Sequence, residues 1–353
     1  MTGWEFWPAW FGTSFALAAP LTGRIIAWAE RLGVVDRPNA RSSHTRVTPR
    51  GGGAAIVAVT VLASCVAGLL DAPAGFRLAA AVVPAVAVAT VSWIDDVRSL
   101  RNRVRFGVHL LAAAAATALL GPIRELELGH WGRLDLGPLS WPLTILWITG
   151  LTNAFNFMDG IDGIAGLTAT AAGLGLAVAA RSCGCPSLAA ACLAFAGAAV
   201  GFLTRNWPPA RIFMGDVGSA FCGFLLAVLP MAAAPPGAVA LTVPVAVLAL
   251  WPFIFDTIFT LLRRLRRGEN IFQAHRSHLY QRLVIAGWSH AATSTLYGWL
   301  ATVGAAVAVA PLVNPAVRQL FAPIAVFYTV ASGTFLVFLV MLAERWRPST
   351  RDS

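Results

Sequence analysis

The chain has 353 residues, of which 58% are hydrophobic and only 12% are charged. Soluble domains contain about 25% charged residues, so this composition excludes an ordinary soluble protein and predicts a membrane protein. The formal net charge is +10, and no lysine is present, so arginine supplies the positive charge. In a membrane protein this excess fits loops that lie against anionic lipid headgroups and bind anionic substrates, and no nucleic acid is expected as a partner.

Apolar segments of roughly the length that a spanning helix needs recur along the whole chain. They predict an all-α, polytopic membrane protein with about eleven transmembrane helices, in a single domain that covers residues 1–353. The segments lie near residues 9–29, 52–71, 75–94, 104–121, 138–155, 163–180, 186–203, 216–233, 238–262, 290–312 and 319–343.

The placement of the arginines predicts how these helices are oriented. Of the 26 arginines, 21 lie near Arg24, in the C-terminal tail, or in the loops around residues 30–50, 97–105, 204–211 and 263–282. Loops rich in arginine stay in the cytoplasm during insertion, so we expect all of these loops to be cytoplasmic. The N-terminus is then outside and the C-terminus is cytoplasmic.

One polar stretch, residues 153–166, interrupts the apolar runs with two carboxylates and two amides. Asp159 and Asp162 are three residues apart, which would place them on one face of a helical turn. An ordinary turn is the alternative, because Asn, Asp and Gly are common turn residues. A charge at mid-bilayer costs roughly 3 kcal/mol, however, so acidic residues here favour a functional role. Three glycines would let the phosphates of a ligand approach the backbone: Gly160, Gly163 and Gly166.

Two adjacent carboxylates, Asp95 and Asp96, end the third apolar segment and precede three arginines at positions 101, 103 and 105. Neighbouring like charges repel, so the pair requires a divalent cation or the nearby arginines. Mg²⁺ held by one or two carboxylates together with substrate phosphates is a common arrangement. A helix end that is merely paired with the following arginines is the alternative.

The segment from Arg205 to Ser219 contains Asn206, Phe213 and a Gly-Asp-x-Gly-Ser sequence around Asp216. This sequence begins the eighth apolar segment and predicts a helix start that binds an anion or a metal. The alternative is that Asp216 is a plain N-cap, a position for which aspartate is well suited.

The last polar segment, residues 274–282, places His275 and His278 at the i, i+3 spacing of a helix. A zinc site is disfavoured because no third ligand is nearby and soft ligands are absent. We expect Arg276, Arg282 and the imidazoles to bind phosphate instead. Asp256, inside the ninth apolar segment, is expected to pair with an arginine across the bundle.

The first polar segment runs from Asp36 to His44 and continues from Thr48 to Gly53. By itself this segment could equally be part of a functional site or a plain basic loop closed by a glycine-rich helix start. All five polar segments lie on the arginine-rich side of the predicted topology, however. We therefore expect them to form one site.

Taken together, these segments resemble the polyprenyl-phosphate N-acetylhexosamine-1-phosphate transferase family, also called glycosyltransferase family 4. The resemblance covers most of the chain. Its motifs occur in order on the expected cytoplasmic loops: Asp95-Asp96, Asn153-x-x-Asn156-Phe-x-Asp159-Gly-x-Asp162-Gly, Asn206 with Phe213-Met-Gly-Asp216-x-Gly-Ser219, and His275-Arg276-x-His278.

The resemblance implies a role for each matching residue. Asp216 would be the main metal ligand, with Asp96 as a second one. Asp95 and Asp96 would position or deprotonate the acceptor phosphate, and Asp159 would be their catalytic partner. The remaining motif residues would bind the nucleotide sugar: Asn156, Asp162, Asn206, Phe213, His275, Arg276 and His278.

The resemblance also implies the reaction and its partners. Undecaprenyl phosphate would accept an N-acetylhexosamine-1-phosphate from a UDP-N-acetylhexosamine, with Mg²⁺ as cofactor, or Mn²⁺ in its place, and with release of UMP. The protein would lie among the lipids of the bacterial inner membrane with a cytoplasmic active site, and association into a homodimer is left open.

The sequence from His275 to Leu283 departs from the triple histidine of the muramoyl-pentapeptide transferase branch. It looks instead like the branch that starts O-antigen synthesis with FucNAc or QuiNAc, which places the protein in lipopolysaccharide and cell-surface polysaccharide biosynthesis. A muramoyl-pentapeptide-type transferase is the alternative within the family. A secondary transporter is the alternative from another class, but the acidic residues cluster at one interface and no inverted repeat is visible.

Overall fold

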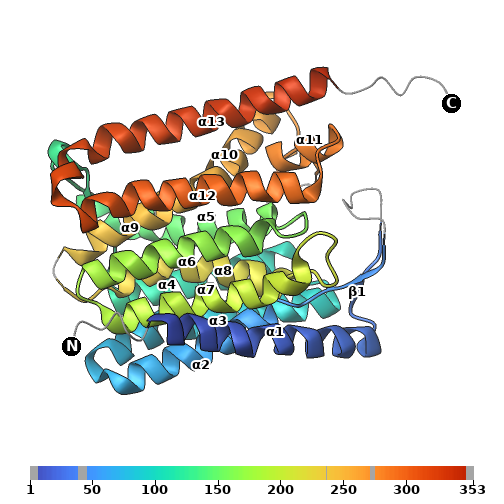
Figure 1. Cartoon of the computed structure of the whole chain (residues 1–353), viewed down its shortest axis with the longest axis horizontal. Helices are drawn as coiled ribbons and strands as arrows, with labels where there is room; N and C mark the ends of the chain where they lie inside the picture. Colours follow the sequence, from blue (N-terminus) through green and yellow to red (C-terminus); the bar gives the residue numbers. More distant parts are fainter. Residues whose placement is uncertain (1–6, 39–45, 236, 271–274, 347–353) are drawn as a thin grey trace.

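The structure is a computed structural model that describes residues 7–38, 46–235, 237–270 and 275–346. Residues 39–45, which include most of the first polar loop up to His44, lie outside the described ranges. Figure 1 shows long helices that run side by side along one direction, with β1 and α11 at one end of the bundle. The described part of the chain starts at the opposite end.

The described residues form thirteen α-helices. Their bounds are α1 Trp7–Leu32, α2 Ala54–Leu70, α3 Ala72–Arg98, α4 Asn102–Leu120, α5 Ser140–Met158, α6 Ile164–Ser182, α7 Pro186–Asn206, α8 Asp216–Val228, α9 Ala238–Ala249, α10 Trp251–Arg266, α11 Leu279–Ile285, α12 His290–Val313 and α13 Phe321–Arg345.

Short elements join these helices. The described residues contain two antiparallel two-stranded sheets, β1 (Val35–Asp36) with β2 (Thr48–Pro49) and β3 (Glu125–Glu127) with β4 (Arg133–Asp135). Four 3₁₀-helices complete the described elements: η2 Gly129–Trp131, η3 Gly137–Leu139, η4 Leu229–Ala232 and η5 Pro315–Leu320.

The architecture confirms an all-α polytopic membrane protein. Six described helices are long and apolar enough to span a membrane, or seven if α9 and α10 form one span bent by 63°. The expected segment 238–262 is therefore broken at Leu250, next to Pro252, which cannot donate a helical hydrogen bond. Helix α2 and the pair α8 and η4 are apolar but shorter. The count of eleven crossings and the sidedness of the termini stay predictions.

Small residues allow the helices to pack closely. Gly197 and Gly201 are four residues apart on α7 and face α1: a Cβ on Gly197 would lie 2.3 Å from the carbonyl oxygen of Phe11, and one on Gly201 would lie 2.7 Å from the Cβ of Ala18. Such spacing lets two backbones approach in a membrane, where packing rather than water exclusion drives helix association.

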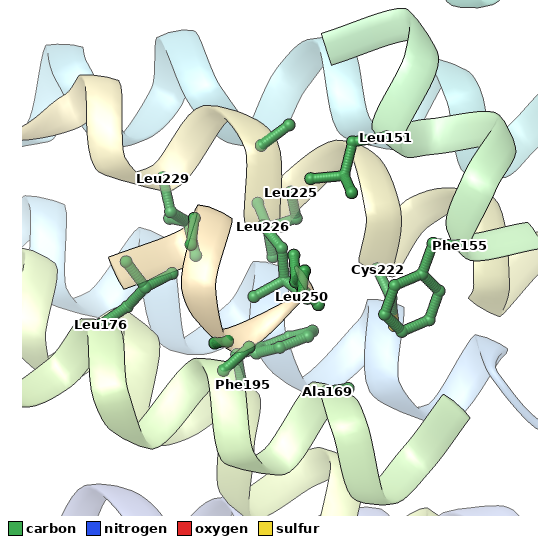
Figure 2. Close-up of a cluster of buried hydrophobic side chains, with 14 of the residues drawn as sticks. Leu151, Phe155, Ala169, Leu176, Phe195, Cys222, Leu225, Leu226, Leu229 and Leu250 are labelled. Atoms are coloured by element: carbon green, nitrogen blue, oxygen red, sulfur yellow. The ribbon is translucent and has the colours of Figure 1, made fainter. Parts of the chain in front are cut away.

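The centre of the bundle is filled by aliphatic and aromatic side chains from α5 to α9. Figure 2 shows Leu151 and Phe155 of α5 facing Cys222 and Leu225 of α8. Phe155 and Leu225 are fully buried. This core holds α5 and α8 against each other, and the polar residues described below lie where the two helices reach the end of the bundle.

Candidate active site

Helix α8 begins with a carboxylate supplied by another helix. Both oxygens of Asp96, at the end of α3, accept backbone hydrogen bonds, one from the amide of Asp216 at 3.2 Å and one from that of Val217 at 3.0 Å. Arg50 lies beside it, with Nε 3.8 Å from Asp96 Oδ1. A carboxylate stabilises the first amides of a helix, so Asp96 caps α8 from outside its own segment.

The start of α8 also packs directly on the loop after β2. The amide of Phe213 donates to the carbonyl of Pro49 at 2.8 Å, and that of Gly53 donates to the carbonyl of Met214 at 2.9 Å. A Cβ on Gly53 would lie 2.3 Å from the Cα of Gly218, so this contact requires glycine. The glycines expected to open a helix in this loop therefore serve a backbone contact.

Arg105, on α4, links two acidic residues and one amide that come from three other helices. Its guanidinium lies 2.7 Å from Asp95 Oδ2 and 2.6 Å from Asp216 Oδ2, and it donates to Asn156 Oδ1 at 3.3 Å. The amide of Asn156 donates to Asp216 Oδ1 at 3.0 Å and to the hydroxyl of Ser219 at 2.8 Å. Asp216 is not the N-cap of α8, since Gly215 holds that position, and its side chain is held by charge contacts at 30% exposure.

Asp159 is the exception among these carboxylates. It follows the last residue of α5 and is half-buried, yet its carboxylate has no hydrogen bond or ion pair with the rest of the described chain. Burial raises the pKa of Asp159 well above the ordinary value, and the charges of Asp216, Asp96 and Asp162 raise it further. An acid in this position favours a cation as its partner.

Asp162 does not share a helical face with Asp159, because residues 159–163 form a turn between α5 and α6. Its Oδ2 accepts a hydrogen bond from the amide of Ala210 at 3.0 Å and lies 3.4 Å from Nδ1 of His290. Asn206 is similarly occupied: its oxygen accepts from the amide of Gly163 at 2.9 Å and its amide donates to the carbonyl of Ile212 at 2.9 Å. Both residues join loops.

The glycines at positions 160, 163 and 166 pack against side chains of the protein itself. A Cβ on Gly160 would lie 2.0 Å from the hydroxyl of Tyr280, and one on Gly163, where φ is +83°, would lie 3.3 Å from the ring of Trp207. A Cβ on Gly166 would lie 3.1 Å from Leu203. The protein's own side chains therefore fill the Cβ side of these glycines, and the close approach of phosphates to them stays a prediction.

The two histidines of the last motif are not on one helix. His278 is the N-cap of α11, and His275 lies in the loop before it, with the two rings 5.0 Å apart. His278 is buried, and its Nδ1 lies 3.2 Å from Oδ1 of Asp256. Burial, with the charges of His278 and Arg264, lowers the pKa of His275 to about 4, so this imidazole is neutral at physiological pH.

Asp256 pairs with a histidine rather than with an arginine, contrary to the expectation. It is fully buried and accepts from the amides of Leu279 and Tyr280 at 2.8 and 3.1 Å, and from the hydroxyl of Tyr297 at 2.7 Å. It therefore caps α11 as Asp96 caps α8. Arg282, expected to bind phosphate, instead makes a two-point pair with Glu344 at 2.7 and 2.6 Å.

The polar segments expected to form one site do meet, as far as they are described. The motifs at 95–96, 156–159 and 213–219 share Arg105 and Asp96 as links, and Tyr280 reaches the 157–160 turn. Phe213, His275 and Arg276 are partly exposed and belong to the segments that form the same end of the bundle. In Figure 1 it is the end that carries β1 and α11.

Oxygen donors for a hard cation are present in this site. In the described ranges there is no group of three or more His, Cys, Asp or Glu side chains that could hold a metal by themselves. Mg²⁺ needs fewer, because it keeps water ligands and takes one or two carboxylates together with substrate phosphates. The lone carboxylate of Asp159 and the partly exposed carboxylate of Asp216 fit Mg²⁺ or Mn²⁺ bound in this way.

Sequence reasoning missed three residues that organise the site. Arg105 was one of three arginines after the acidic pair, and only its position as the fourth residue of α4 brings it between Asp95 and Asp216. Arg50 stood in a basic loop without a distinguishing neighbour. Tyr280 belongs to the last polar segment of the sequence, but in the structure its ring is fully buried. The one usable signal was the rarity of tyrosine, which occurs three times in the chain.

Comparison with known proteins identifies the family. The model of a family described as Glycosyl transferase family 4 matches residues 78–234. The chain is 31% identical over 280 residues to a probable undecaprenyl-phosphate N-acetylglucosaminyl 1-phosphate transferase of Bacillus subtilis, which covers 78% of this chain and 75% of the relative.

Two further relatives have related names. The chain is 32% identical over 328 residues to decaprenyl-phosphate N-acetylglucosaminephosphotransferase of Mycobacterium tuberculosis, covering 83% of this chain and 80% of the relative. It is 35% identical over 249 residues to phospho-N-acetylmuramoyl-pentapeptide-transferase of Synechococcus elongatus, covering 63% and 65%. The chain therefore belongs to glycosyltransferase family 4, the polyprenyl-phosphate N-acetylhexosamine-1-phosphate transferases.

Proposed function

We propose that the protein transfers an N-acetylhexosamine-1-phosphate from a UDP-N-acetylhexosamine to undecaprenyl phosphate. The observation that carries this proposal is the lone carboxylate of Asp159 among the charges of Asp216 and Asp96, at the arginine-rich end of an apolar bundle. The names of the Bacillus and Mycobacterium relatives support a polyprenyl phosphate acceptor and an amino-sugar donor.

In the proposed reaction an oxygen of the lipid phosphate attacks the β-phosphorus of the UDP-sugar. A new phosphorus–oxygen bond forms, and the bond from the β-phosphorus to the oxygen that bridges to the α-phosphorus breaks. UMP leaves with that bridging oxygen, and the sugar remains on a lipid diphosphate. Phosphoryl transfer of this kind needs positioning and charge neutralisation rather than covalent help from the protein.

Mg²⁺, when bound, neutralises phosphate charge. We assign Asp216 and Asp159 to holding the cation. Asp216 is partly exposed, and Asp159 has no partner among the described residues, so both carboxylates are available as ligands. Asp96 was expected as a second ligand, but its two oxygens already accept the first amides of α8, so we assign it to fixing Asp216. Asp95 pairs with Arg105 and would orient that guanidinium toward the phosphates.

For the donor, we retain Phe213, His275 and Arg276 as contacts of the nucleotide sugar. Asn156 contacts Asp216, and Asp162 and Asn206 join loops, so we place these three behind the site. The buried His278 belongs with them. This division predicts that substitutions of the three donor contacts raise the KM for the donor. Substitutions of the other four residues should act indirectly, by displacing the residues that contact the substrates.

We place the site on the cytoplasmic face of the bacterial inner membrane, because the loops at this end hold most of the arginines. The product would be the first lipid-linked intermediate of O-antigen or a related cell-surface polysaccharide. The relative from Synechococcus makes a muramoyl-pentapeptide donor the second candidate.

The test is to incubate the purified protein with undecaprenyl phosphate, Mg²⁺ and a panel of UDP-N-acetylhexosamines, including UDP-MurNAc-pentapeptide. Nucleotide products are then quantified with and without EDTA. We expect UMP that depends on both lipid and metal, and the donor that gives most of it identifies the sugar. Release of UDP, or no nucleotide from any donor in the panel, would contradict the proposed reaction.

A further inference from the structure

The position of Asp159 depends on its backbone, because its carboxylate has no partner in the described part of the chain. Contacts with other segments hold the turn after Asp159, and two of them are hydrogen bonds to its later residues. The hydroxyl of Ser294 donates to the carbonyl of Asp162 at 2.7 Å, and the amide of Gly163 donates to Asn206 at 2.9 Å. Within the turn, the amide of Asp159 donates to the carbonyl of Asn156 at 3.3 Å, near the limit of a hydrogen bond.

The side of the turn before Asp159 is held by Tyr280. Its hydroxyl donates to the carbonyl of Phe157 at 3.1 Å, across 123 residues of sequence. This carbonyl lies two residues before Asp159, at the end of α5. A helix end leaves carbonyls without helical partners, so an outside donor here fixes the direction in which the chain leaves the helix.

Tyr280 is itself held rigidly. Its side chain is fully buried, and its amide donates to Asp256 Oδ2 at 3.1 Å. Its ring lies 5.9 Å from that of His278 and meets that of Tyr297 edge-on at 6.4 Å. Tyr297 in turn donates to the same carboxylate, Asp256, at 2.7 Å. The hydroxyl of Tyr280 is therefore placed by a buried network.

Gly160 gives the hydroxyl the space to reach the turn. A Cβ at this position would lie 2.0 Å from the hydroxyl oxygen of Tyr280 and 3.1 Å from its Cζ. Because the ring is enclosed, it cannot move aside at low cost. Gly160 therefore lacks a side chain where the hydroxyl of Tyr280, from α11, needs space.

We propose that Tyr280 is a positioning residue for Asp159: its hydroxyl, anchored through Asp256, fixes the α5 exit and with it the position of the Asp159 carboxylate. The effect on turnover rests on the proposed function. The effect on the turn itself does not, since it follows from the hydrogen bond to Phe157 and the contact at Gly160.

The test compares Tyr280→Phe with Tyr328→Phe in otherwise intact, purified protein. Tyr328 is a matched control because it is also buried and its hydroxyl also donates to a backbone carbonyl, that of Leu300 at 2.7 Å, but it joins α13 to α12. Each variant loses one oxygen atom and the hydrogen bond that its hydroxyl donates to a backbone carbonyl. Thermal unfolding is measured first, to show that both variants fold equally well.

The first readout is amide hydrogen exchange of residues 157–163 in the metal-free protein. We expect exchange of this segment to rise several-fold in Tyr280→Phe and to stay at the wild-type rate in Tyr328→Phe. Gly160→Ala should raise it as well, because the added methyl group displaces the hydroxyl. Unchanged exchange of this segment in both Tyr280→Phe and Gly160→Ala would overturn the proposal, whatever the enzyme assay gives.

The second readout is kinetic. Displacing a reacting group by about 1 Å can cost on the order of 100-fold in rate, so we expect kcat of Tyr280→Phe to fall at least about tenfold, with the donor KM within about twofold of wild type. Tyr328→Phe should keep both values. A raised KM with unchanged kcat in Tyr280→Phe would contradict the positioning of Asp159. Absence of UMP release in the wild type would contradict the proposed function and leave the exchange experiment to decide the proposal.

Discussion

Asp162 and Asp256 differ from Asp159 and Asp216 in what their carboxylates contact, although all four come from segments that meet at the α11 end of the bundle. The first two accept hydrogen bonds from backbone amides of distant segments. Asp216 contacts side chains, among them those of Arg105 and Asn156, and Asp159 has no partner among the described residues. Aspartate therefore stabilises the backbone at Asp162 and Asp256, whereas the carboxylates of Asp159 and Asp216 remain available to a ligand.

This comparison separates stability from chemistry. A carboxylate that accepts buried amides stabilises the fold, since an amide left without an acceptor costs about 1–3 kcal/mol. A carboxylate near other negative charges destabilises the metal-free fold and is retained for its ligand. Changes in the two groups should therefore affect different measurements, and the following predictions are ordered by the size of the effect.

The largest effect is expected for Asp216→Asn. This change removes the charge that the proposed cation and Arg105 both contact, so lipid-dependent UMP release should fall by about a thousandfold, as for loss of a group that stabilises developing charge. The protein should still insert and purify, because the amide of Asn156 keeps an acceptor. Purification yield and turnover are measured together. A variant that turns over normally would remove Asp216 from the metal site.

Asp256→Ala should mainly destabilise the protein. It leaves two amides, the hydroxyl of Tyr297 and the buried His278 without their acceptor, and breaking a buried pair costs about 3–5 kcal/mol. We expect a lower midpoint of unfolding in detergent and, as a consequence, reduced yield. If the midpoint is unchanged while turnover is lost, Asp256 acts in the chemistry and the division drawn here is wrong at this residue.

Asp159→Asn should stabilise the metal-free protein at high pH. The folded protein raises the pKa of Asp159, so the folded state opposes ionisation, and the wild type loses stability as pH rises above the ordinary pKa of aspartate. With EDTA at pH 8 we expect the melting temperature of the variant to exceed that of wild type by about 2–4 °C. The difference should shrink as the pH is lowered toward 4. A lower melting temperature of the variant at pH 8 would show that Asp159 has a stabilising partner.

The smallest effect is expected for Glu344→Gln, which breaks the two-point pair with Arg282. Exposed ion pairs contribute about 0–1 kcal/mol, and the side chain of Glu344 is 43% exposed. Stability and kcat/KM should both stay close to wild type. A marked loss of donor affinity on Arg282→Gln, measured in parallel, would restore the phosphate-binding role that the sequence suggested for this arginine.

Much of the fold could be predicted from the sequence because membrane helices are set by local composition. Each apolar segment became helical, although the segment 238–262 is divided just before Pro252 and the segment 216–233 ends in the 3₁₀-helix η4. The meeting of polar loops at one end also followed from the arginines. The short α11 was not foreseen, because its start is stabilised by Asp256, 23 residues before Leu279.

The contacts of individual carboxylates could not be predicted. Asp159 and Asp162 belong to one motif, and nothing nearby indicates that Asp162 accepts the amide of Ala210, 48 residues later. Asp95 and Asp96 are adjacent on α3, and which of them caps α8 depends on the direction of each side chain relative to a distant helix. The resemblance supplied the candidate residues of the site, but their partners required the tertiary structure.

The most direct test of this account is turnover per folded molecule in Asp159→Ala and Asp162→Ala, made by the same substitution three residues apart. The assay is UMP release with undecaprenyl phosphate and Mg²⁺, normalised to the folded fraction from thermal unfolding. We predict that Asp159→Ala keeps or raises the melting temperature and loses nearly all turnover, whereas Asp162→Ala melts at lower temperature and retains substantial turnover per folded molecule. An active Asp159→Ala beside a stable but inactive Asp162→Ala would contradict the account.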